Sequence, residues 1–247
     1  MMRRFVRLFV FIFVLVFSWS VRPAGAVVIS DLDGLEDYFN CRGQINCKFL
    51  KRGIKRDSVD CIEDPDLVFE FDRHLKKDDF NIEGKIRYLG LVAKKYRYNV
   101  RALDDGSYVV SSKFFIKNRV SQDSRDLLQA RLNEAAQIWE SFSPFPFSVY
   151  FEFQLVEEKK DADFSINVKA GKSRGPYDTN WSLLWGARSF AHEMGHVLGL
   201  DDEYKNRPGG GSTKNCSKES MMCNHYLKQA KFLKYHYYMI FRRLYCA

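Results

Sequence analysis

The sequence shows no internal repeat and no low-complexity block, which excludes a repeat array and argues against a disordered chain. It lacks the cysteine spacing of a zinc finger and the aspartate-rich pattern of a calcium loop, so neither of these metal sites is expected. What it has is 247 residues, of which 46% are hydrophobic. This is ample for one buried core with a small extra lobe.

Long apolar runs are scarce, and the one at the N terminus is short. Residues 1–26 carry a basic start, an apolar stretch at 8–17 and a small-residue site that ends at Ala26. This order is typical of a secretory signal peptide, and the apolar stretch is too short for a membrane span. We therefore expect cleavage after Ala26, a secreted or periplasmic protein, and no stable membrane anchor once the signal is removed.

Strong clustering of positive charge is also missing. Removing residues 1–26 takes away four arginines and no acid, which lowers the net charge from +8 to +4. Apart from a basic run at residues 48–56, the lysines and arginines are scattered, and such a run is usually a solvated face. We expect no nucleic-acid partner.

The six cysteines all lie after residue 26. An even number of cysteines in an exported chain predicts disulfides, although the sequence cannot choose among the many pairings that are possible. Short loops favour a bridge between Cys216 and Cys223. They also favour one bridge within the group of Cys41, Cys47 and Cys61.

Apolar residues alternate with polar ones over much of residues 27–106, for example in LVFEF at 67–71 and in KIRYLGLV at 85–92. A period of two predicts antiparallel strands. The Asp105-Gly106 step predicts a hairpin turn between two of them. We therefore expect residues 27–106 to form a β-rich N-terminal region, which is a pro-segment, an extra lobe or a targeting module.

The apolar spacing becomes helical after residue 120, where Leu128, Leu132 and Trp139 recur on one face. Helical and alternating stretches then follow one another to the C terminus. The order predicts an α+β domain over residues 107–247. The predicted elements are strands at 147–156 and 162–170, and helices at 121–142, 189–199 and 227–244.

Two of the five histidines, His192 and His196, lie four residues apart on a predicted helix, with Glu193 between them. Residues four apart project from the same face of a helix, so both imidazoles can reach a single ion. This is the spacing of zinc ligands. A catalytic zinc ion takes three protein ligands and keeps its fourth position for water, so one ligand is still missing.

The third ligand is expected just after the helix. Gly199 can adopt the left-handed conformation that ends a helix and turns the chain back, which brings Asp202 towards the ion. Asp201 and Glu203 flank this residue and are alternatives. A further rival is Glu219, placed like the remote glutamate ligand of thermolysin-like enzymes.

The stretch HEMGHVLGLDD at residues 192–202 resembles the HExxHxxGxxH/D signature of the metzincin zinc peptidases, in the variant with aspartate in the last place, as in snapalysin-type enzymes. The resemblance implies a twisted mixed sheet, an active-site helix and a C-terminal helix. It also implies a methionine turn beneath the zinc. SMMC at residues 220–223 lies at the family's distance, with Met221 or Met222 as that methionine.

The sequence departs from the family after this turn. Many metzincins have a tyrosine two positions after the methionine, whereas Cys223 and Asn224 stand at those places here. His225 and Tyr226 come slightly later. An oxyanion-binding side chain is therefore not assigned by the resemblance.

The activity implied by the resemblance is that of a monomeric zinc endopeptidase acting on protein or peptide substrates. Glu193 would be the general base that takes a proton from the zinc-bound water. The substrate would pair as an added strand with residues 162–170. The alternative is a secreted binding or toxin-like module with a structural zinc site, closed by a fourth protein ligand such as His225 or Glu219.

Overall fold

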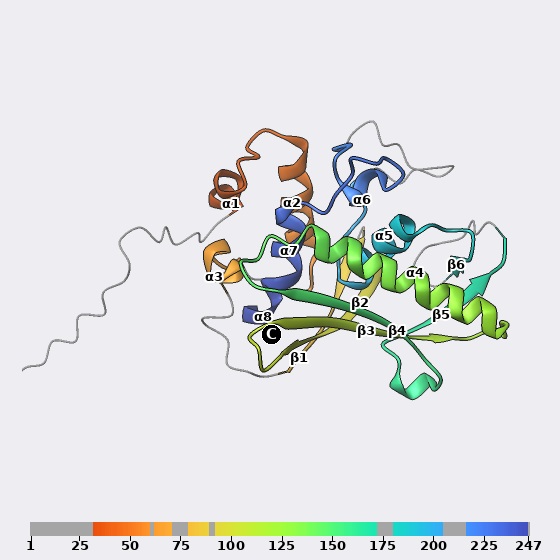
Figure 1. The fold of residues 1–247 in the computed structure, drawn as a ribbon. Helices are drawn as coiled ribbons and strands as arrows, with labels where there is room; N and C mark the ends of the chain where they lie inside the picture. The colour runs from red at the N-terminus through yellow and green to blue at the C-terminus, as the bar shows by residue number, and fades with distance from the viewer. Residues whose placement is uncertain are drawn as a thin grey trace, which may run out of the picture.

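The computed structural model describes residues 32–59, 62–70, 79–88, 92–171, 180–204 and 216–246 (Figure 1). The expected signal peptide at 1–26 and Cys61 lie outside these ranges. Among the described residues, none of the helices combines the length and the apolarity that a membrane crossing needs.

A six-stranded mixed sheet forms the frame of the described fold. The first three strands form an antiparallel meander, and the third pairs in parallel with both the fourth and the fifth. The sixth is a short strand parallel to the fifth. The strands are β1 (Phe80–Tyr88), β2 (Val92–Ala102), β3 (Tyr108–Ile116), β4 (Val149–Val156), β5 (Phe164–Lys169) and β6 (Asn180–Ser182).

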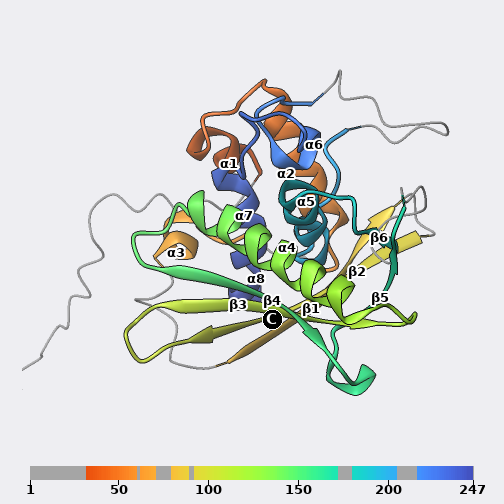
Figure 2. The same ribbon diagram turned by 45° about the vertical axis from the view of Figure 1, so that its right-hand side comes forward.

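The helices lie on one side of this sheet. Figures 1 and 2 show α4 running along the sheet, with α5 beside it, whereas α1 and α6 lie farther away. The helices are α1 (Leu32–Tyr38), α2 (Ile45–Arg56), α3 (Pro65–Phe69), α4 (Gln122–Ser141), α5 (Ala187–Val197), α6 (Met221–Asn224), α7 (Lys234–Phe241) and α8 (Arg243–Cys246), with a 3-10 turn at Lys159–Asp161. The α+β class is confirmed.

Helix α4 confirms the predicted amphipathic helix. The Ser121 hydroxyl caps its start by accepting a hydrogen bond from the amide of Ser124. Leu128, Leu132 and Trp139 are fully buried. The Trp139 indole donates to the carbonyl of Ala191 over 3.1 Å, which ties α4 to α5.

The β-rich expectation is wrong for the first part of the N-terminal region. LVFEF, expected as a strand, begins in α3, where Asp64 caps the first turn and Pro65 occupies it. The basic run at 48–56 lies in α2, whose buried face includes Leu50 and Ile54 at helical spacing. These capping and four-residue signals outweigh the short alternating pattern. Strands begin only with β1.

The Asp105-Gly106 hairpin is confirmed. Gly106 adopts a φ of +84°, and the Asp105 carboxylate accepts a hydrogen bond from the amide of Ser107. Because β2 pairs with β3 across this turn, one sheet continues through the boundary expected at residue 106.

The end of the chain differs in detail from the expectation. The helix expected at 227–244 is shorter and divided into α7 and α8. The stretch expected to receive a substrate strand forms β5, but β6 pairs with its C-terminal half. That half of β5 therefore offers no free edge on the side of β6.

Two disulfides are present in the described part of the chain. One joins Cys41 to Cys47 and the other joins Cys216 to Cys223. Both expected short-loop bridges are confirmed. The first joins the segment before α2 to Cys47 in the first turn of α2, and the second closes the loop that carries the two expected methionines.

Candidate metal centre

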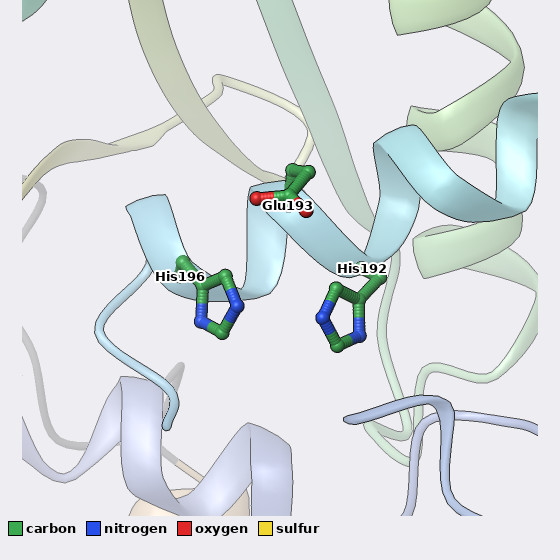
Figure 3. A group of neighbouring side chains, drawn as sticks. All are labelled: His192, Glu193 and His196. Carbon is green, nitrogen blue, oxygen red and sulfur yellow. The ribbon is translucent and has the colours of Figure 1, made fainter. Parts of the chain in front are cut away.

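Helix α5 carries both histidines that the sequence analysis singled out. Phe190, Met194 and Val197 anchor the helix in the core. His192 and His196, one turn apart, are 2% and 4% exposed. Figure 3 shows their imidazoles side by side on the same side of the helix, with Glu193 a step round from them.

Asp202 lies against both imidazoles. Its Oδ1 is 3.2 Å from the Nε2 of His192 and 3.3 Å from the Nε2 of His196. Zinc bonds to nitrogen and oxygen are about 2.0–2.1 Å long, so two ligands at tetrahedral corners lie about 3.3 Å apart. The two measured separations match that spacing. The expected partner of the histidines is therefore in place.

The turn that returns Asp202 to the histidines is a helix cap at Gly199. This glycine has a φ of +82°. Its amide bonds to the carbonyl of His196 over 3.0 Å, and the amide of Leu200 bonds to the carbonyl of Gly195 over 2.8 Å. These two bonds form a Schellman motif, which satisfies the last carbonyls of the helix and reverses the chain. The predicted role of Gly199 is confirmed.

The tautomers of both histidines are set by backbone carbonyls. The Nδ1 of His192 lies 3.0 Å from the carbonyl oxygen of Met221, and the Nδ1 of His196 lies 2.9 Å from that of Leu200. A carbonyl can only accept, so each Nδ1 carries a hydrogen. The lone pair of each Nε2 is then free to face Asp202. This is the outer support that metal-binding histidines usually have.

The charges at this point attract a cation or protons. Burial and the charge of Lys94 lower the pKa of His196, but the carboxylates of Asp202 and Glu193 outweigh them and raise that pKa to about 9. Burial raises the pKa of Asp202, but the two imidazoles outweigh it and hold that pKa well below its usual range. A metal ion and protons therefore compete for these lone pairs.

Glu193 belongs to the same group. Its carboxylate and the imidazoles of His192 and His196 have ligand atoms that all lie within 4.8 Å of one another. Within the described residues, its Oε2 is buried and finds no hydrogen-bond partner. A buried carboxylate oxygen without a partner is costly and is available to bind a proton or a ligand.

The two methionines have separate tasks. Met221 supplies the carbonyl that holds His192. Met222 packs under α5, since a Cβ added at Gly195 would lie 2.5 Å from the sulfur of Met222. Met222 therefore packs on α5 at Gly195, which lies between the two histidines in sequence. Which of the two methionines forms the methionine turn stays a prediction.

The neighbouring carboxylates face other groups. The Oδ2 of Asp201 is 2.6 Å from an Nη of Arg56. The Oε1 of Glu203 is 2.8 Å from the Nε2 of His236 and also accepts from the hydroxyl of Tyr235. Glu219 is exposed, whereas His192 and His196 are buried. Among the candidates for the third ligand, Asp202 has the geometry.

Sequence reasoning named His225 only as a possible fourth ligand, and it missed the aromatic neighbour Tyr204 and the arginine Arg188. The ring of Tyr204 stacks on His192, and the ring of His225 lies 4.6 Å from it between centroids. Burial, together with the charge of His192, lowers the pKa of His225 to about 3. Arg188 donates to the carbonyl of His225 over 2.9 Å. Only the nearness of Tyr204 to the motif could have signalled its place beside His192.

Comparison of the chain with models of known protein families, and with curated proteins, gives no match. The function therefore has to be inferred from the geometry of the site. It defines a buried group of His192, Glu193 and His196 that could hold a metal ion, with Asp202 against both histidines.

Proposed function

We propose that this protein is a secreted zinc endopeptidase of metzincin type. In this proposal His192, His196 and Asp202 hold the zinc ion, and Glu193 is the general base. The observation that carries it is the place of Asp202 Oδ1, which lies at the spacing of tetrahedral ligands from both Nε2 atoms, with both tautomers set by carbonyls.

The donor set suits zinc. Two imidazoles and one carboxylate are borderline ligands that zinc accepts in catalytic sites, where a fourth position stays open. When bound, zinc would supply a water of near-neutral pKa and would polarise the carbonyl of a peptide.

The task of Glu193 follows from its place on α5. Next to His192 in the chain, it has a carboxylate oxygen without a partner among the described residues. Such a carboxylate can accept a proton from the attacking water and donate it to the departing amine. Asp202 and the histidines are engaged with one another, so they are not available for this step.

The secreted location rests on separate observations. Two disulfides fit an oxidising compartment, and residues 1–26 have the order of a signal peptide. A protein or peptide substrate and a monomeric state complete the proposal.

A structural zinc site in a secreted binding module is the second candidate. The observation in its favour is the place of His225, whose ring lies 4.6 Å from that of His192. A fourth protein ligand would close the coordination and leave no position for water. The placement of Glu193 in the group favours the peptidase, because a closed site has no use for a base.

The test is cleavage of a denatured protein by the chain that begins at Val27. Glu193→Gln should lose cleavage by at least about a hundredfold while it keeps its zinc, because removing a general base costs about that much. Glu219→Gln, an exposed glutamate of the same type, is the control and should keep both. Equal cleavage by wild type and Glu193→Gln would rule out the proposed base, and zinc without cleavage in the wild type would favour the binding module.

A further inference from the structure

The basic run of α2 is only partly a solvated face, because Lys48 and Lys55 are exposed whereas Arg52 and Arg56 reach the turn after α5. Arg56 lies 2.6 Å from the Oδ2 of Asp201 through its Nη1, and Arg52 donates a short hydrogen bond to the carbonyl of Asp202. The two arginine side chains are only 30% and 28% exposed, and that of Asp201 is 7% exposed. Both contacts reach the turn that carries the candidate third ligand.

This turn is held from two sides. On one side, Arg243 of α8 donates to the carbonyls of Leu198 and Gly199 over 2.7 and 2.9 Å. On the other side, α2 holds Asp201 and the backbone of Asp202 through its two arginines. A small cavity where α2, the turn and α7 meet is lined by Arg52, Asp201, Glu203 and His236, among others.

The contacts of Arg52 and Arg56 fix the orientation of Asp202. Asp201 and Asp202 are adjacent carboxylates, yet Asp201 faces Arg56 whereas Asp202 faces the histidines. The carbonyl of Asp202 is fixed by Arg52, so its side chain starts from a fixed backbone. An outer contact of this kind orders a ligand before the metal arrives and so raises metal affinity.

We propose that α2 is a positioning element of the metal centre, in which Arg56 and Arg52 aim Asp202 at the histidines. This rests on the proposed function, because it requires that Asp202 binds the metal. It also makes α2 part of the mature protein. A pro-segment that was removed with α2 would take the support of the third ligand away.

The C-terminal end of α2 is also held in place by buried charged contacts. Asp57, the residue that follows the helix, is buried and accepts from Arg242 and Arg243 over 2.5 and 2.8 Å. Arg243 is the same residue that holds Gly199. One connected set of charges therefore joins α2, α8 and the end of α5.

The experiment measures zinc affinity of the chain from Val27 by competition with a chelator, and the visible spectrum of its cobalt form. Arg56→Gln should weaken zinc binding about tenfold to a hundredfold, the usual cost of losing an outer contact. Lys55→Gln is the matched control, because Lys55 is the exposed neighbour of Arg56 on the same helix. This substitution removes the same positive charge. It should bind zinc as wild type does.

A second variant covers the case in which Arg56→Gln fails to fold. Asp201→Asn keeps the shape of the side chain and should weaken zinc binding in the same way, with an altered cobalt spectrum. Unfolding of the metal-free proteins by heat separates loss of fold from loss of affinity. If Arg56→Gln and Asp201→Asn both fold and bind zinc as tightly as Lys55→Gln, the inference is overturned. If the wild type itself binds no zinc, the proposed function fails first.

Discussion

At the scale of single residues, the candidate site depends on two positions where only glycine fits. Gly199 has a positive φ, and a Cβ there would lie 2.6 Å from an Nη of Arg243. At Gly195 the sulfur of Met222 occupies the space that a Cβ would need. The left-handed glycine was predictable from its spacing to His196, because a helix cap has a local sequence signal. The crowding at Gly195 was not, since it comes from a residue distant in sequence.

The two costs at Gly199 can be separated. Gly106 has nearly the same φ, +84° against +82°, but a Cβ there would meet nothing within 4 Å. Gly106→Ala should therefore lose only the backbone penalty of about 1–2 kcal/mol in the free energy of unfolding. Gly199→Ala should lose about 3 kcal/mol or more, because Arg243 must also move. Urea unfolding measures both, and equal losses would contradict the crowding.

At the scale of elements, apolar patterns that repeat over several helical turns predict helices correctly. Patterns of only about five residues do not distinguish a helix from a strand. Helix α4 and helix α5 were predicted because their apolar residues repeat over several turns. The LVFEF segment was misread, because five residues fit a strand as well as one helical turn. Asp64 and Pro65 carried the better signal. The pairing of α2 with Asp201 had no signal at all, since the basic run resembles any solvated helix face.

The buried charges that join α2 to α8 give a prediction for Asp57. Asp57→Asn leaves the buried guanidiniums of Arg242 and Arg243 without their shared carboxylate, and breaking such a pair costs about 3–5 kcal/mol. Asp37→Asn, which breaks an exposed pair with Arg42, is the control and should change stability little. Chemical unfolding at neutral pH measures both variants, and similar losses would contradict the prediction.

The same residue predicts how stability depends on pH. Burial raises the pKa of Asp57, but Arg243 and Arg242 outweigh it, so the pKa is lowered in the folded protein. Its contribution is therefore complete above the unfolded pKa of about 3.9 and is lost as the pH falls through the folded value. The difference in unfolding free energy between wild type and Asp57→Asn should narrow below about pH 4. A difference that stays constant into strong acid would contradict this.

At the scale of the whole molecule, the sheet is built from the middle of the sequence. The buried charges of Asp57 and Arg243 join segments near the two ends of the described chain. The α+β class, the helix that carries the histidines and the place of Asp202 could be predicted, because each depends on residues close in sequence. The contacts of Arg52, Arg56 and Asp57 could not be predicted. They join segments that are separated by up to 186 residues, and a single sequence holds no signal for such pairs.

The central claim is a zinc ion held by two histidines and one aspartate, with a position left for water. X-ray absorption at the zinc edge, on the whole mature chain with its metal content known, tests it most directly. We predict one zinc ion per chain with two imidazoles, and oxygen atoms in the remaining positions. A third imidazole, which His225 would supply, or a chain that takes up no zinc would contradict it.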